Sequence, residues 1–155
     1  MAQEATKFSS VNPATGQTIW QGISASTAEI DTTINTARQA FIPWMSLSFE
    51  ARYNYLQKFV QILTAQAESL TELLAQETGK PLWEAKTEIN AMIGKLDISK
   101  QAFTERCKET EKDMQGVTSY VRHKPHGVVL VLGPFNLPAH LPNGHIMPAL
   151  LAGNT

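Results

Sequence analysis

Two long stretches of the chain carry hydrophobic residues at the three- and four-residue spacing of an amphipathic helix. The first runs from about Ser48 to Thr78, and the second runs from about Leu82 to Glu109. This spacing places the hydrophobic side chains on one face of each predicted helix. Because only Gly79-Lys80-Pro81 separates the two stretches, we expect the helices to pack as an antiparallel pair.

The residues before these helices predict a turn, a short strand and a further helix. Residues 8–25 are polar, and Asn12-Pro13-Ala14-Thr15-Gly16 followed by Gln17-Thr18-Ile19-Trp20 is typical of a turn that leads into a short strand. Ser26 and Glu29 match a capping box, in which each side chain bonds to the other residue's backbone amide. The helix that they begin is expected to end at Pro43.

The pattern changes after the second long helix. Val117 to Lys124 has the mixed polarity of an exposed strand. Gly127 to Leu132 is a short apolar run bounded by glycines, which is typical of a strand buried on both faces of a parallel sheet. Ile146 to Asn154 predicts a last helix. Since nothing follows that could pair with the apolar strand, we interpret the chain as an α/β protein with two long helices followed by strands of an incomplete parallel sheet.

Composition and charge exclude several functional classes. Thirteen basic and fourteen acidic residues give a net charge of −1, which offers no electrostatic footprint for nucleic acid or for an anionic membrane surface. No apolar run approaches the length of about 20 residues that spans a bilayer. Together with the absence of a recognisable secretory signal, this indicates a cytoplasmic protein.

The residues that often carry chemistry give little direct evidence. The single cysteine, Cys107, lies on the apolar face of a predicted helix and is interpreted as a packing residue. The four histidines lack ligand spacing, so no metal site is expected. Gly127 and Gly133 do not form a dinucleotide-binding fingerprint. Asn136 lies between two prolines and, by itself, is typical of a turn.

Five short motifs in order suggest a family. They are Val11-Asn12-Pro13-Ala14-Thr15-Gly16, Glu77-Thr78-Gly79-Lys80-Pro81, Pro125-His126-Gly127-Val128-Val129, Gly133-Pro134-Phe135-Asn136-Leu137-Pro138 and Pro148-Ala149-Leu150-Leu151-Ala152-Gly153-Asn154-Thr155. In this order and spacing they resemble the aldehyde dehydrogenase superfamily, from about Phe8 to the end. The resemblance implies the amino-terminal part of the cofactor-binding domain. Its expected parts are a turn and strand segment (1–25), a helical part (26–110), an oligomerisation-type strand and linker (111–126) and the start of the nucleotide-binding sheet (127–155).

The resemblance also implies a mechanism. In the family, a cysteine thiolate attacks the aldehyde, a hydride passes to nicotinamide, and a water activated by a glutamate hydrolyses the thioester. Neither the cysteine nor that glutamate is expected in this segment, so the segment alone is expected to be inactive. Asn136 matches the asparagine that stabilises the oxyanion. Leu132, Gly133, Pro134, Phe135 and Asn136 match the segment that lies along the cofactor, which is NAD or, as the other family cofactor, NADP.

Part of the sequence bears on the substrate. His140-Leu141-Pro142-Asn143-Gly144-His145-Ile146 and Lys80-Pro81-Leu82-Trp83-Glu84-Ala85 resemble the succinylglutamic semialdehyde dehydrogenases of arginine catabolism. Leu141 and Gly144 fall where relatives line the substrate tunnel, and a glycine at 144 leaves room for a long polar aldehyde. The flanking His140 and His145 are candidates to bind a carboxylate. The full-length protein is expected to form a homo-oligomer.

Two alternatives to a piece of an enzyme stay open. The chain is either a piece of such an enzyme or a non-catalytic helical interaction module derived from one. A nucleotide-binding decoy that uses the Leu132–Asn136 turn alone is the third reading.

Overall fold

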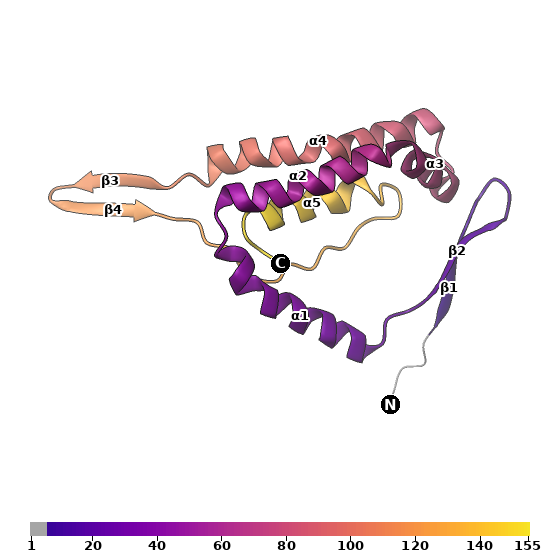
Figure 1. The fold of residues 1–155 in the computed structure, drawn as a ribbon, viewed down its shortest axis with the longest axis horizontal. Helices are drawn as coiled ribbons and strands as arrows, with labels where there is room; N and C mark the ends of the chain where they lie inside the picture. The colour runs from indigo at the N-terminus through magenta and orange to yellow at the C-terminus, as the bar shows by residue number, and fades with distance from the viewer. Residues whose placement is uncertain (1–5) are drawn as a thin grey trace.

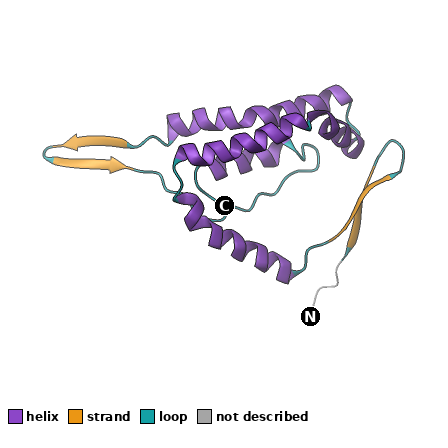
Figure 2. Cartoon of the chain, in the orientation of Figure 1, coloured by secondary structure: helices purple, strands orange, loops and turns teal. Residues whose placement is uncertain are grey.

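The computed structural model describes residues 6–155, which fold into a helical body with two small β-hairpins (Figures 1 and 2). The elements, in chain order, are β1 (Lys7–Val11), β2 (Thr18–Ile23), α1 (Thr27–Met45), α2 (Phe49–Ala65), α3 (Ala67–Thr78), α4 (Leu82–Arg106), β3 (Thr110–Met114), β4 (Val117–Val121) and α5 (His140–Leu151).

The amino-terminal hairpin pairs β1 with β2 in an antiparallel register. The predicted turn is confirmed: the Asn12 side-chain oxygen accepts a hydrogen bond from the amide of Ala14 at 2.9 Å. The predicted strand is confirmed in β2, whereas β1 was not predicted because its residues are mostly polar. The rings of Phe8 and Trp20 pack edge to face across the hairpin, with centroids 5.1 Å apart.

Helix α1 begins with the predicted capping box. The Ser26 hydroxyl accepts from the Glu29 amide at 3.2 Å, and the Glu29 carboxylate accepts from the Ser26 amide at 2.7 Å. The predicted end at Pro43 is wrong, since the helix continues through Met45. A proline this close to the end removes one backbone hydrogen bond, and the next turn still closes through the bond from Ser46 to Ile42.

The first long amphipathic stretch forms two helices instead of one. It begins after the N-cap Ser48 and ends at Gly79, as predicted, but Gln66 leaves the helical conformation and separates α2 from α3. Gly79 has φ +72°, in the left-handed region that glycine adopts without strain. The predicted antiparallel packing against α4 is confirmed, because Phe49 at the start of α2 stacks on Phe103 near the end of α4.

Helix α5 runs beside α4 in the same direction (Figure 1). It starts six residues earlier than the predicted Ile146, at His140. The Asn143 side-chain amide donates to the Met92 carbonyl at 3.2 Å. One hydrophobic core cluster joins α2, α4 and α5, and its buried members are Tyr53, Leu56, Leu96, Met147 and Leu151.

A buried arginine at the start of α2 links the carboxyl ends of α1 and α5. Arg52 of α2 is 7% exposed. Its Nε donates to the Leu151 carbonyl at 3.0 Å, and its Nη1 donates to the carbonyls of Met45 and Leu47. These carbonyls belong to the unsatisfied carboxyl ends of α1 and α5 and to the linker before α2. Arg52 therefore fixes α1 and the end of α5 on the core.

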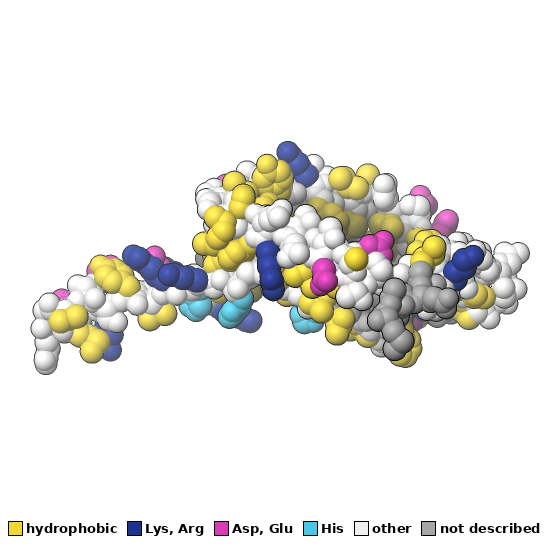
Figure 3. Space-filling view, turned by 90° about the horizontal axis from the view of Figure 1, so that it is seen from below, with side chains coloured by type: hydrophobic (Ala, Val, Ile, Leu, Met, Phe, Trp, Pro, Cys, Tyr) yellow, Lys and Arg dark blue, Asp and Glu magenta, His cyan; other side chains and the backbone are white. Residues whose placement is uncertain are grey.

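The hairpin of β3 and β4 projects away from the helices (Figure 1). The predicted strand is confirmed over Val117–Val121, and its partner β3 was not predicted. Every residue of both strands is exposed, and the arm carries hydrophobic and basic side chains along its length (Figure 3). Its expected role in association between subunits stays a prediction.

The apolar run Gly127–Leu132 differs from its prediction. It is extended but forms no regular strand, and Leu130 and Leu132 are 83% and 84% exposed. A buried strand needs partners on both edges, and among residues 6–155 only Thr155 pairs with this run. The Val129 amide donates to the Thr155 carbonyl, and the Thr155 amide donates to the Gly127 carbonyl. Bonds from one residue to both neighbours of its partner are the pattern of a parallel pair.

Residues 6–155 contain neither a membrane-spanning helix nor a cluster of metal ligands. No helix in this range is long and apolar enough to cross a membrane. The same range holds no group of three or more histidine, cysteine or acidic side chains that is placed to bind a metal ion.

Candidate functional site

The predicted cofactor and oxyanion residues, Leu132 to Asn136, lie together on the loop that leads into α5. The extended segment ends at Leu132, and a turn through Asn136 follows. Phe135 is 92% exposed. Phe135, Asn136 and Pro138 of this loop border a hollow of about 650 Å³. Its other lining residues come from the β1–β2 hairpin and from the region around the end of α3: Phe8, Ser9, Ser10, Trp20, Glu77, Thr78 and Lys80.

Gly133 is required where the loop passes α5. A Cβ at this position would lie 2.3 Å from Cγ of Pro142, a distance at which one of the two must move. Glycine therefore lets the turn lie directly on the first part of α5. The turn sets the path of the chain into Asn136.

A buried ion pair lies behind this turn. The Lys80 ammonium is 2.6 Å from Oε2 of Glu88, and the two side chains are 8% and 2% exposed. The same ammonium donates to the Asn136 carbonyl at 3.1 Å. Oε1 of Glu88 accepts from the backbone amides of Ala139 and His140, each at 3.0 Å. Because α5 has no side-chain cap of its own, Glu88 of α4 caps it from outside.

Two opposing effects act on the pKa of the Glu88 carboxyl. Burial raises this pKa, whereas the hydrogen bonds from Lys80 and from the amides of His140 and Ala139 lower it. The net result is a pKa below the ordinary value of 4.5. Glu88 is therefore ionised at neutral pH and holds both of its partners.

The depressed pKa predicts how the stability contribution of Glu88 depends on pH. A carboxyl with a lower pKa in the folded state stabilises the fold fully above about pH 4.5, and this contribution is lost as the pH falls through the folded value. The difference in thermal midpoint between the unmodified protein and Glu88→Gln is expected to be constant from pH 7 to about pH 5 and to shrink below that. Scanning fluorimetry across this range measures it. A difference that grew on acidification would contradict the assignment.

Gly144 and Leu141 lie on α5, one turn apart. Leu141 is 37% exposed and Gly144 is partly buried. Lys95 of α4 reaches over Gly144, since its Cε and Nζ are each 3.8 Å from the place that a Cβ on Gly144 would occupy. Among residues 6–155, the structure pairs Lys95 with no carboxylate. The absence of a side chain at 144 thus leaves space next to a cation.

The two candidate histidines and the single cysteine lie in different surroundings. Nδ1 of His140 is buried and has no hydrogen-bond partner within the described part of the chain, whereas His145 is exposed. Cys107 caps the carboxyl end of α4 and is partly buried. Its interpretation as a packing residue stays a prediction.

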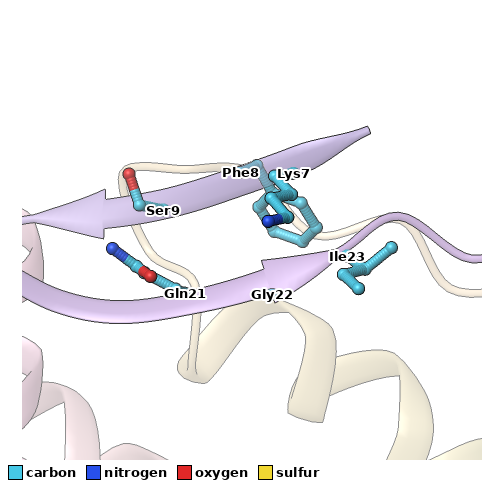
Figure 4. A pocket seen from close by; sticks show the side chains of 6 residues that line it. All are labelled: Lys7, Phe8, Ser9, Gln21, Gly22 and Ile23. Carbon is cyan, nitrogen blue, oxygen red and sulfur yellow. The ribbon is translucent and has the colours of Figure 1, made fainter. Parts of the chain in front are cut away.

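A second hollow lies on the amino-terminal hairpin (Figure 4). It is lined by Lys7, Phe8, Ser9, Gln21, Gly22 and Ile23. Lys7 is the only ionisable side chain among these lining residues. This hollow offers no acid–base or nucleophile pair, so the Asn136 loop is the better candidate site.

Comparison with known proteins decides the family. The model of the aldehyde dehydrogenase family matches residues 1–155, which is the whole chain. The chain belongs to the aldehyde dehydrogenase family. The predicted resemblance is thereby confirmed.

Curated relatives refine the assignment within the aldehyde dehydrogenase family. The chain is 50% identical over 155 residues to the N-succinylglutamate 5-semialdehyde dehydrogenase of Burkholderia ambifaria, covering 100% of the chain and 32% of that protein. It is 51% identical over 148 residues to the enzyme of the same name from Burkholderia cenocepacia, covering 96% of the chain and 30% of that protein. The chain thus spans about a third of the length of these relatives.

Solved aldehyde dehydrogenase structures share the fold. An aldehyde dehydrogenase from Brucella melitensis biovar abortus superposes with a TM-score of 0.89 at 28% identity, over 97% of this chain and 31% of that one. The NADP-dependent glyceraldehyde-3-phosphate dehydrogenase of Bacillus halodurans, complexed with NADP, superposes with a TM-score of 0.88 at 26% identity, over 97% of this chain and 33% of that one. A NAD-dependent benzaldehyde dehydrogenase of Corynebacterium glutamicum superposes with a TM-score of 0.85 at 25% identity, over 96% of this chain and 33% of that one. The predicted fold class is confirmed.

Three charged residues of the site escaped the sequence analysis. Lys80 was noted only as part of a motif, and Glu88 and Lys95 were not singled out. One signal was present for Glu88, which falls three residues after Ala85 and four before Met92 on the apolar face of the predicted helix. A carboxylate on such a face needs a buried partner.

Proposed function

We propose that the full-length protein oxidises an aldehyde to a carboxylate with a nicotinamide cofactor, and that this segment supplies the oxyanion donor. The observation that carries the proposal is Asn136, whose carbonyl is held by Lys80 and whose side chain borders an open hollow. Among residues 6–155 its side chain makes no hydrogen bond, so its amide is free to donate. As the aldehyde oxygen gains negative charge, this amide donates to it and stabilises the transition state.

The cofactor would lie along Leu132–Asn136. The exposed side chains of Leu132 and Phe135 and the bare backbone of Gly133 give an apolar, accessible surface that fits the flat rings and the ribose of such a molecule. When bound, the nicotinamide supplies the hydride acceptor. NAD is the proposed cofactor, with NADP as the alternative, since the structural relatives named above include users of each.

The proposed substrate is N-succinylglutamate 5-semialdehyde, in arginine catabolism. The curated relatives that carry this name support it. So does the chemistry at Gly144, because this aldehyde bears two carboxylates. Lys95, which pairs with no carboxylate of residues 6–155, places an ammonium over the space that glycine leaves. Leu141 would contact the methylene groups of the substrate.

Lys95→Met tests this substrate assignment. Losing one charge-assisted hydrogen bond is expected to raise the KM for N-succinylglutamate 5-semialdehyde by about 10-fold or more. The KM for hexanal, an uncharged aldehyde, should stay within about twofold. Steady-state kinetics of the full-length enzyme with both aldehydes measure the difference. An equal change for the two substrates would contradict a contact between Lys95 and a carboxylate.

A helical interaction module is the second candidate function. The observation that favours it is the exposed apolar surface of the segment, which includes Trp83 at 71%, Leu130 at 83% and Phe135 at 92%. The mass of the native protein, detected with an antibody against residues 46–110, separates the candidates. A mass about three times the 17.1 kDa of this chain supports the enzyme, and a mass of 17.1 kDa supports the module. Homo-oligomer formation and a cytoplasmic location stay predictions.

A further inference from the structure

The segment from Asn136 to His140 is held at both of its ends by one buried ion pair. Lys80 bonds to the carbonyl of Asn136 itself. Glu88 bonds to the amides of Ala139 and His140, three and four residues later. The 2.6 Å contact between the two side chains joins these anchors into one unit.

This arrangement is a costly way to stabilise a loop. Two charges that are 8% and 2% exposed lose most of their hydration, and a buried pair of this kind often adds no net stability over apolar residues of the same volume. What the pair does provide is a fixed geometry, because each of its hydrogen bonds ends on a backbone group or on the partner. The carboxylate of Glu84, which is 47% exposed, lies 4.0 Å from the same Lys80 ammonium. Other contacts of the turn are the van der Waals contact between Gly133 and Pro142 and the first hydrogen bonds of α5.

We propose that Lys80 and Glu88 are positioning residues for Asn136. They hold its main chain from the side of α4, so that its side-chain amide meets the aldehyde oxygen at hydrogen-bond distance. The inference rests on the proposed function, in which Asn136 is the oxyanion donor. A donor of this kind must be fixed in advance, and a displacement of about 1 Å is enough to lower the rate strongly.

The test removes both charges at once in the full-length enzyme. Lys80→Met combined with Glu88→Gln leaves no single buried charge behind, and the glutamine oxygen still accepts from the start of α5. We expect kcat to fall about 10-fold while the KM for the aldehyde changes less than about twofold, because the donor acts only in the transition state. The matched control is Lys86→Met, which replaces an exposed lysine of α4. This substitution should leave kcat unchanged.

A structural role and a positioning role are separated by repeating the double substitution in an Asn136→Ala background. If the pair acts through Asn136, its removal there causes no further loss of kcat. Multiplicative losses, or a normal kcat in the double variant, would overturn the inference while leaving Asn136 as the donor. A normal kcat for Asn136→Ala alone would instead overturn the proposed function and the inference with it.

A second variant covers the case in which the double variant does not fold. Lys80→Arg keeps the charge and the pairing with Glu88 but moves the donor that reaches the Asn136 carbonyl. The expected result is a smaller loss of kcat that disappears in the Asn136→Ala background. A loss that persists there would overturn the inference.

Discussion

Asn136→Ala is expected to lower kcat of the full-length enzyme by about 10²- to 10³-fold, the effect of losing one oxyanion donor. The KM for the aldehyde should change little, because the neutral carbonyl gains much less from the donor than the developing oxyanion does. Asn136 is exposed and its side chain is not part of the core, so the variant should fold normally. Initial rates of NADH or NADPH formation measure the effect.

Asn90→Ala provides the control for this prediction. Asn90 is another exposed asparagine, on α4, and lines a hollow away from the Asn136 turn. Its replacement should leave kcat unchanged. Equal rates for both variants would show that Asn136 is an ordinary turn residue.

Arg52→Met is expected to produce the largest loss of stability. The substitution keeps much of the side-chain volume but leaves the carbonyls of Leu151, Met45 and Leu47 without their donor. Unsatisfied buried acceptors cost about 1–3 kcal/mol each, and with partial access of water we expect a total loss of about 3 kcal/mol in the free energy of unfolding. Urea unfolding of the full-length protein, followed by tryptophan fluorescence, measures the change.

The matched control for this stability prediction is Arg38→Met. Arg38 is an exposed arginine of α1, and its loss should change the free energy of unfolding by no more than about 0.5 kcal/mol. Similar losses for the two variants would mean that the backbone contacts of Arg52 contribute little.

Local signals in the sequence predicted the helices well and the sheet poorly. The Ser26 capping box, the helix start near Ser48 and the stop at Gly79 each depend on a few neighbouring residues, and each was confirmed. The break at Gln66 left no signal, because glutamine is a good helix former. The burial predicted for Gly127–Leu132 depends on neighbouring strands that residues 6–155 do not supply.

For the site, too, local sequence motifs predicted some residues, whereas contacts between distant residues were not predicted. Asn136 and the turn around it were found through short motifs, since the residues concerned are neighbours in sequence. The contact of Lys80 with Asn136 spans 56 residues, and that of Glu88 with His140 spans 52. Only the packing of α5 along α4 brings them together. The same packing places Lys95 over Gly144, a pairing that no local spacing predicts.

The decisive measurement is kcat/KM of the full-length protein for N-succinylglutamate 5-semialdehyde and for hexanal, with NAD and with NADP. We predict aldehyde-dependent reduction of at least one cofactor and a clear preference for the dicarboxylate aldehyde. No aldehyde-dependent reduction with either cofactor would contradict the enzymatic function, and a preference for hexanal would contradict the substrate assigned from Gly144 and Lys95.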